Sequence, residues 1–474
     1  MKVKDNNKFY TIFKTLSLSE KKEFCEFLRL SFIKKPRLSD FIIEKIETGE
    51  NLYLYLDNKY SERSLWNIYS ELTRSLNQFL SLKEIMSDEK EMHNIKRKQF
   101  RKRNIRSLFI SELRNDIKEL KSREFSYSIL KDIHHAAYSS LPELIKSGIS
   151  NEFSEINKLS SDFLILSSLF EIYSNSIEDI IRKEFYGEKS ELLNQNIFKF
   201  IEIEQLIKLI NEKYPEYVDF FYIIFNLNLA IREPLNFLAY MNAKERFFLI
   251  AHKCSREYRS EIYVLLVNIC NIISNRTKRN MDAQIFEIFK SKIDNGLTDD
   301  LKNVKIGENH FRDYIYIALR ENDVEWAEEF LHKYSPLLAP SIKENNINTA
   351  LAFINYHKKN YSLAIDHILK LNRRFYIHDL DFYTIQIFSY FDAGNIVDCL
   401  RLKIRFQEYA NTNSKLPELY KSGVTNFLKI LTGMISYIES GKKDILNDLE
   451  YAIENSTGLL WKSWILAKIK EIRH

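Results

Sequence analysis

Glycine and proline are scarce in this chain, and their scarcity restricts the folds that it can adopt. The 474 residues include 10 Gly and 7 Pro, whereas average usage gives about 33 Gly and about 24 Pro at this length. Hairpin turns and Gly-rich phosphate loops depend on these two residues. We therefore expect long helices with short connections, with more than about 65% of the chain helical and no sheet.

Helical periodicity recurs along the chain. Residues 17–30 begin with Ser17 and Glu20 at the spacing of a capping box. Residues 60–80 place apolar side chains on one helix face, at Leu65, Ile68, Leu72, Leu76 and Phe79. Only "LYLYL" (52–56) alternates with the period of two that strands show. By its pattern this segment fits a strand as well as a helix, but no neighbouring segment resembles a strand that could pair with it.

The C-terminal third contains a repeat. Small residues recur at Ala327, Ala364 and Cys399, and each stands where the second helix of a helix–turn–helix would begin. This spacing is close to the 34-residue tetratricopeptide period, in which a small residue lets the second helix pack tightly on the first. Leu351 and Ala352 also fit that motif in the middle repeat, although its signature Trp and terminal Pro are missing.

These patterns predict an all-α fold, a right-handed α-solenoid of antiparallel helix pairs that is tetratricopeptide-like in the C-terminal third. We expect an N-terminal helical domain (1–88), a central helical array (89–300) and repeats with a capping helix (301–474). The capping helix would carry an apolar face formed by Trp461, Ile465, Ile469 and Ile472. A solenoid needs such a helix to seal its last repeat.

Both ends of the sequence resemble a known family. The segments "NHFRDYIYIALRENDVEWAEEFLHKYSPLL" (309–338) and "WILAKIKEI" are similar to those of a family of uncharacterised helical-repeat proteins from the Bacteroidetes lineage. Near the N-terminus, "SLSEKKEFCEFLRLSF", "YSERSLWNIYSEL" and "RKRNIRSLF" resemble the opening domain of that family. The resemblance implies a helix for "LYLYL" and tetratricopeptide-like repeats at the C-terminus. It implies no activity and no site residues.

Motifs for catalysis, cofactors and metals are absent from the sequence. It contains no GxxxxGK[ST], GxGxxG or HExxH motif. His134 and His135 are adjacent, so on a helix their side chains diverge by about 100° and do not share a metal easily. Cys25, Cys254 and Cys270 have no CxxC partner, and neither has Cys399, so we expect ordinary core thiols. We therefore predict a protein that is not an enzyme and has no cofactor.

The sequence also lacks the features of secretion and of membrane insertion. Asp5, Asn6 and Asn7 stand where a signal peptide requires an apolar core. Residues 263–273 form a markedly apolar stretch, but Asn268 and Asn271 interrupt it, so it suits a buried helix better than a membrane span. These features predict a cytoplasmic protein.

A basic stretch lies near residue 100. Residues 90–123 hold 12 Lys or Arg against 4 acids, a net charge of +8, whereas the whole chain carries +5. Such a local patch could contact nucleic-acid phosphates, could bind an acidic protein partner, or could remain a solvated helix face. An apolar stripe from Ile105 to Leu120, extended backwards, would bury Lys98 and Lys102, so either the helix kinks near Asn104 or it projects into solvent. The candidate patch residues are Lys96, Arg97, Lys98, Arg101, Lys102, Arg103 and Arg106.

The repeats suggest a second candidate surface. Tetratricopeptide arrays bind extended peptides or helices on the concave surface formed by the first helix of each pair. Counting back from Ala327 and Ala364, the side chains expected there are Arg312, Asp313, Tyr316, Arg320, Thr349, Phe353, Tyr356 and His357. Arg, Tyr and His suit contacts with an acidic partner or a C-terminal carboxylate. Alternatively, these residues simply pack against the next repeat.

Two functions follow as hypotheses. The first is a non-enzymatic scaffold that binds a partner peptide or protein through its repeats. The alternative is a nucleic-acid- or ribosome-associated protein that uses the basic helix 96–106.

Overall fold

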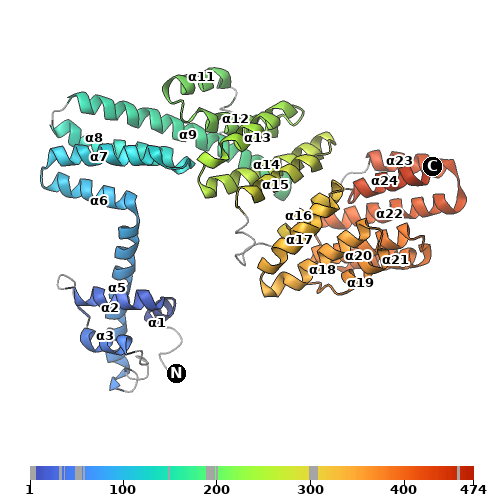
Figure 1. The fold of residues 1–474 in the computed structure, drawn as a ribbon, viewed down its shortest axis with the longest axis horizontal. Coiled ribbons are helices and arrows are strands. Elements are labelled where there is room, and N and C mark those ends of the chain that lie inside the picture. The colour runs from blue at the N-terminus through green and yellow to red at the C-terminus, as the bar shows by residue number, and fades with distance from the viewer. Residues whose placement is uncertain are drawn as a thin grey trace. The chain divides into compact units, whose positions relative to one another are not determined.

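The computed structural model of the chain describes residues 7–30, 35–36, 38–48, 56, 59–147, 150–187, 198, 201–297, 308–455 and 459–473. Helix accounts for 84% of these residues, and they include no β-strand. The helices pack in neighbouring pairs (Figure 1). The predicted all-α fold is therefore confirmed. Among the described residues, no helix has both the length and the apolar character that crossing a membrane requires.

The chain divides into two compact units, Met1–Leu169 and Phe170–His474. The division falls within α9, a helix of 37 residues that spans Ser150–Tyr186. The domains expected from the sequence, with boundaries after residues 88 and 300, do not coincide with these two units. Each unit is described separately below.

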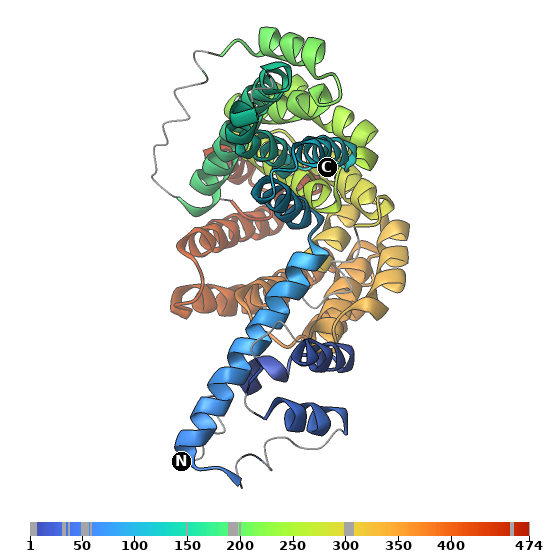
Figure 2. The ribbon, with the colours of Figure 1, turned by 90° about the vertical axis from the view of Figure 1, so that its left-hand side faces the viewer.

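The first unit begins with a small aromatic core. Its described helices are α1 (Lys8–Phe13), α2 (Leu18–Arg29), α3 (Ser39–Glu47), α5 (Glu62–Ser87), α6 (Glu89–Lys102), α7 (Arg106–Ser122), α8 (Tyr127–Ser147) and the start of α9. Figure 2 shows α5 at its full length beside the shorter helices of this core. All five apolar residues of the predicted stripe on α5 are buried.

The capping box predicted from the sequence is present at the start of α2. The Ser17 hydroxyl accepts from the Glu20 backbone N–H, and the Glu20 carboxylate accepts from the Ser17 backbone N–H, which is the predicted capping box. The hydroxyls of Tyr10 on α1 and Tyr69 on α5 lie 2.6 Å apart. Leu56 is buried in the same core. The rest of "LYLYL", residues 52–55, lies outside the described residues.

Helices α6 and α7 form an antiparallel hairpin that reverses at Asn104. Asn104 has a φ of 55°, and the Ile105 N–H bonds the Phe100 carbonyl at 3.0 Å. A left-handed residue followed by this bond is the Schellman ending of a helix. The expected interruption near Asn104 is thus confirmed. Ile105 itself is 36% exposed, so its predicted place in the buried stripe is wrong.

The second unit continues with the rest of α9 and a further set of helix pairs. Its next helices are α11 (Ile203–Lys213), α12 (Val218–Arg232), α13 (Phe237–Ile250), η3 (Ala251–Lys253), α14 (Arg256–Thr277) and α15 (Asp282–Asp294). Tyr263, Leu266 and Cys270 of α14 are buried, as the sequence predicted for the apolar stretch 263–273.

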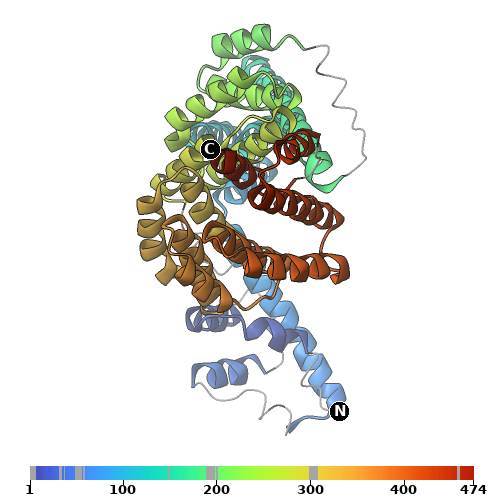
Figure 3. The ribbon, with the colours of Figure 1, turned by 90° about the vertical axis from the view of Figure 1, so that its right-hand side faces the viewer.

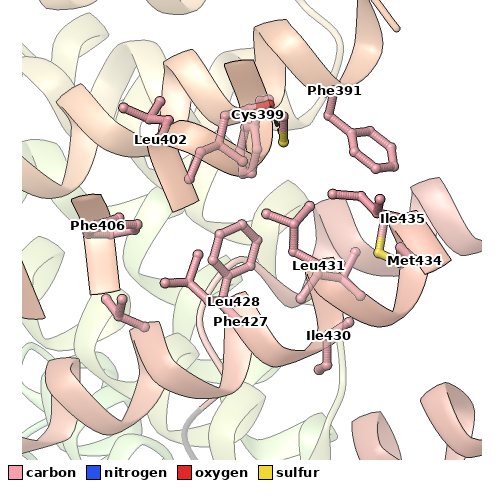
Figure 4. Close-up of a cluster of buried hydrophobic side chains, with 14 of the residues drawn as sticks. Phe391, Cys399, Leu402, Phe406, Phe427, Leu428, Ile430, Leu431, Met434 and Ile435 are labelled. Carbon is pink, nitrogen blue, oxygen red and sulfur yellow. Dashed lines mark hydrogen bonds between the residues drawn. The ribbon is translucent and has the colours of Figure 1, made fainter. Parts of the chain in front are cut away.

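The C-terminal part of this unit carries the predicted repeat. Its helices are α16 (Glu308–Arg320), α17 (Val324–Tyr334), η5 (Ser335–Leu337), α18 (Pro340–His357), α19 (Tyr361–Leu369), α20 (Tyr376–Asp392), α21 (Ile396–Thr412), α22 (Glu418–Ser440), α23 (Lys443–Asn455) and α24 (Lys462–Arg473). Figure 3 shows the last of these helices in orange-red to dark red. Helices α20 to α24 share one apolar cluster, in which Phe406, Phe427 and Leu431 are fully buried (Figure 4).

Three successive helix pairs in this part turn in the same way. Asn322, Lys359 and Gly394 have φ values of 59°, 62° and 74°, and each lies two residues before the second helix of its pair. In each turn the residue that follows the left-handed one donates its backbone N–H to the carbonyl five residues before it, at 2.8 to 2.9 Å. Ala327, Ala364 and Cys399 are each the fourth residue of that second helix, and all three are fully buried. The expected helix–turn–helix positions of these small residues are therefore confirmed.

Candidate partner-binding face

The first helices of the three pairs, α16, α18 and α20, present a connected set of polar and aromatic side chains. We call this set the A-helix face. It consists of Arg312, Tyr316 and Arg320 on α16, Phe353 and Tyr356 on α18, and Asp381, Phe388 and Asp392 on α20. Five of these eight residues were predicted from the sequence.

Arg312 connects α16 to α20. Its Nε and Nη2 atoms donate to the two carboxylate oxygens of Asp381 at 2.5 and 2.6 Å, and Nη1 lies 3.1 Å from Asp313. Burial alone would lower the pKa of Arg312, but the carboxylates of Asp381 and Asp313 outweigh it and raise the pKa. A buried two-point pair of this kind fixes the geometry of its helices. Removing one partner would leave an uncompensated buried charge.

Aromatic contacts fill the space beside this ion pair. The Tyr316 and Phe353 rings meet edge to face with centroids 5.4 Å apart, and the Arg312 guanidinium lies 5.4 and 5.6 Å from the two ring centres. Thr349 and Phe353 are buried. The alternative stated above therefore holds for these side chains. They pack within the protein, so a helix bound to the A-helix face would meet the other residues of that face.

Arg320 and Tyr356 make contacts of a different kind, because both reach the C-terminal helix α24. Arg320 forms an ion pair with Asp282 of α15 at 2.6 Å and donates to the Ser463 hydroxyl at 3.2 Å. The Tyr356 hydroxyl donates to Asp392 at 2.6 Å and accepts from the Trp464 indole N–H at 2.8 Å. Burial and the nearby Asp392 carboxylate raise the pKa of Tyr356.

Trp464 and Lys468 of α24 complete the arrangement. The Trp464 ring stacks on Phe388 with centroids 4.1 Å apart. The Lys468 ammonium lies 3.0 Å from the Asp392 carboxylate, and their side chains are 14% and 7% exposed. Sequence analysis missed both residues. The signal that could have identified them was a Trp and a Lys one helical turn apart, directly beside the predicted apolar stripe of the capping helix. Ile465 and Ile469 of that stripe are buried, as predicted.

Asp313 and His357 lie at the margin of the face. Asp313 is about half exposed and pairs with Arg312. His357 is partly buried, its ring meets Tyr356 edge to face at 5.6 Å, and burial lowers its pKa. His357 is therefore predominantly neutral at neutral pH and adds no positive charge to the face.

The basic patch on α6 and α7 is smaller than predicted. Arg97 is buried and pairs with Asp116, so it does not belong to an exposed patch. Lys96 lies 3.4 Å from Glu112, and Arg103 donates to Gln99. Lys98, Arg101, Lys102 and Arg106 are exposed and have no ion-pair partner among the described residues. The exposed side chains of Ile105 and Leu108 lie at the same end of the hairpin.

Within the part of the chain that the structure describes, no three His, Cys, Asp or Glu side chains are grouped to hold a metal ion. His134 bonds the Ser160 carbonyl at 2.8 Å, while His135 is exposed, so the two rings diverge as expected. The four cysteines are free and buried.

No family model, curated protein or solved structure matches this chain. The resemblance to the Bacteroidetes family therefore stays a prediction.

Proposed function

We propose that this chain is a non-enzymatic, cytoplasmic scaffold that binds a partner peptide or protein through its A-helix face. We further propose that its C-terminal third is a tetratricopeptide-like part of a right-handed solenoid. The three equivalent turns and the small residues that follow them support the second proposal. The observation that carries the first is that the A-helix face already holds a helix. It holds α24 by an aromatic stack, by hydrogen bonds and by an ion pair. Helices bound in grooves are held through anchor side chains on one face, at the spacings i, i+3 and i+4, and Trp and Tyr are frequent among such anchors.

Affinity capture from native lysate, with detection by mass spectrometry, tests this function. The test variant combines Arg320→Ala with Tyr356→Ala, which removes the two predicted side chains that reach α24. The control combines Arg401→Ala with Tyr451→Ala, two exposed residues of the same types in α21 and α23. We expect the test variant to lose partners that the wild type and the control both capture. Equal capture by all three proteins, at equal helical content by circular dichroism, contradicts the proposal.

A second candidate function is association with nucleic acid or the ribosome. The observation that favours it is the group of exposed cations at the α6–α7 turn, Lys98, Arg101, Lys102, Arg103 and Arg106. Each phosphate that a cation neutralises releases counterions, so about five contacts give a log–log salt slope of roughly −4.

The structure determines which substitutions test this candidate. Lys98, Arg101, Lys102 and Arg103 are replaced by Gln, and Arg97 is left intact because its pair with Asp116 is buried. The control replaces the exposed Arg405, Lys415, Lys429 and Lys442 by Gln, an equal loss of charge. Labelled RNA and DNA are titrated at two salt concentrations. If the patch binds, only the first variant flattens the slope, whereas an absence of binding at low salt excludes this candidate.

A further inference from the structure

Helix α24 contacts helices far from it in the sequence. Ser463 meets Arg320, which lies 143 residues earlier, and Trp464 meets Tyr356, which lies 108 residues earlier. A helix that only sealed the last pair would contact α22 and α23. Helix α24 does pack on α22, but it also contacts α16, α18 and α20. It therefore lies along the A-helix face as a bound helix would.

The contacts of Trp464 are selective for tryptophan. Its ring stacks on Phe388 at an interplanar angle of 11°, while Phe391 and Phe427 meet it edge to face at 5.4 and 6.1 Å. The indole N–H donates to the Tyr356 hydroxyl. Leu or Phe could fill the aromatic surroundings, but neither could donate that hydrogen bond.

The contact of Lys468 adds selectivity for a cation one turn further on. The Asp392 carboxylate receives the Tyr356 hydroxyl on one oxygen and the Lys468 ammonium on the other. With Lys468 absent, Asp392 would be a largely buried carboxylate without a cation, which is unfavourable. The face thus provides an aromatic site and an anionic site at the spacing of i and i+4 on a helix.

The stability of bound α24 depends on favourable side-chain contacts and is reduced by backbone strain at Trp461. A free helix of 12 residues is marginal in water, so α24 depends on its contacts. The helix is entered through Trp461, whose φ of 53° is left-handed and strained for a bulky side chain. The Trp461 ring offsets this strain by packing on Phe427, with centroids 4.9 Å apart. A competing helix that makes the same contacts without this strain would therefore have an advantage over α24 at the same contacts.

We infer that the A-helix face is a receptor for an amphipathic helix that carries Trp and, four residues later, Lys, and that α24 occupies this receptor until such a partner helix displaces it. This inference rests on the proposed scaffold function and adds to it the chemistry of the partner. Apolar residues directly after the Trp and directly after the Lys, like Ile465 and Ile469, complete the motif.

A peptide-binding experiment with the full chain tests the inference. The probe is a fluorescent synthetic peptide of residues 459–473, and the test variant is Lys468→Glu, which places a carboxylate against Asp392. Occupancy of the face by α24 reduces the apparent affinity of a competitor by the fraction of free receptor. We expect the variant to bind the peptide about tenfold more tightly than the wild type does. A peptide that itself carries Lys468→Glu should not bind.

Two matched controls make the result specific. Lys470→Glu makes the same change of charge on the exposed side of α24 and should leave peptide binding at the wild-type level. Adding Asp392→Lys to Lys468→Glu restores an ion pair of reversed sign, so binding of the wild-type peptide should fall again. If Lys468→Glu does not fold, Lys468→Gln removes the charge without reversing it.

Hydrogen exchange of residues 462–473 shows whether α24 has been loosened. A folded variant that does not bind the peptide overturns the inference, and so does one whose α24 amides stay as protected as in the wild type. Self-association of the wild-type chain that Lys468→Glu abolishes would identify a second copy's α24 as the occupant and would also overturn the inference. Failure of the scaffold function is distinguishable: the peptide would then bind as expected, while lysate partners would be indifferent to Arg320→Ala with Tyr356→Ala.

Discussion

At the scale of single residues, three small side chains set how closely the C-terminal helices approach. Ala327, Ala364 and Cys399 are fully buried at the same position of three successive helices. Close packing of this kind leaves no room for added methyl groups. These residues were identified from their spacing alone. When a fold requires a small side chain at the same position of every repeat, small residues recur in the sequence at the repeat period.

Enlarging these residues gives the first prediction. Ala327→Leu or Ala364→Leu should overpack the crossing and lower the free energy of unfolding by about 1–3 kcal/mol. Urea denaturation followed by circular dichroism measures the change. Leu363→Ala, next to Ala364 but half exposed, is the control and should have a much smaller effect. A leucine variant as stable as the wild type would contradict the proposed role of the small residue.

His93 of α6 lies between two glutamates of α7. Its Nδ1 lies 2.8 Å from Glu112 and its Nε2 lies 3.0 Å from Glu119. Burial alone would lower the pKa of His93, but the hydrogen bonds to Glu119 and Glu112 outweigh it and raise the pKa. His93, followed by Arg123, lowers the pKa of Glu119 to about 2. Lys96, Arg97, Asp116 and Glu89 are the other charged groups of α6 and α7 around this site.

This geometry gives the second prediction, a dependence of stability on pH. A histidine whose pKa is raised by folding stabilises the folded state fully below its unfolded value near 6.5, and this contribution is lost as the pH rises through the folded pKa. His93→Gln should therefore cost more stability at pH 6 than at pH 8.5. Thermal unfolding of both proteins at the two pH values measures the difference. His135→Gln, an exposed histidine on α8, is the control, and an equal cost of His93→Gln at both pH values would contradict the prediction.

The candidate site was only partly predictable at this scale. Helical period indicated which side chains of α16 and α18 share a face, and Arg320 and Tyr356 do meet a helix there. The helical period does not show whether a neighbouring helix covers a side chain. It therefore did not distinguish Arg320 and Tyr356, which reach α24, from Thr349 and Phe353, which are buried. Trp464 and Lys468 were missed because no local pattern encodes their contacts with Tyr356 and Asp392, which lie far from α24 in the sequence.

At the scale of elements, the helix ends show how a chain poor in glycine turns. Asn104, Asn322 and Lys359 adopt the left-handed conformation at helix ends, where glycine is the usual residue. Gly394 occupies the equivalent position in the third C-terminal pair. Asparagine tolerates this conformation better than other residues with a Cβ do. The scarcity of glycine therefore does not mean a scarcity of tight helix ends.

The third prediction concerns that turn. Gly394→Ala should lower the free energy of unfolding by about 1 kcal/mol, because alanine is strained at a φ of 74°. Gly394→Asn should cost clearly less, since Asn322 serves at the equivalent position. A Cβ at Gly394 would meet no atom within 4 Å, so a clash would not explain the loss. Equal stability of the two variants in urea denaturation would refute the conformational argument.

At the scale of the whole molecule, the fold class followed from the shortage of turn-forming residues and from recurring helical periods. The division into units did not. It falls between Leu169 and Phe170, inside the continuous helix α9, where no proline, glycine or polar run marks a boundary. Sequence patterns reveal boundaries that lie in linkers. A boundary within a helix depends on which residues pack on either half, and those contacts are distant in the sequence.

The position of α24 has an optical consequence. The chain has four tryptophans, and two of them, Trp461 and Trp464, belong to α24 and its entry, whereas Trp66 is 67% exposed on α5 and Trp326 packs in α17. Replacing Trp66 and Trp326 by Phe would leave tryptophan fluorescence that arises only from Trp461 and Trp464. Release of that helix would move both indoles from aromatic surroundings into water and shift their emission to the red. The doubly substituted chain would thus report by its emission whether α24 lies on the A-helix face.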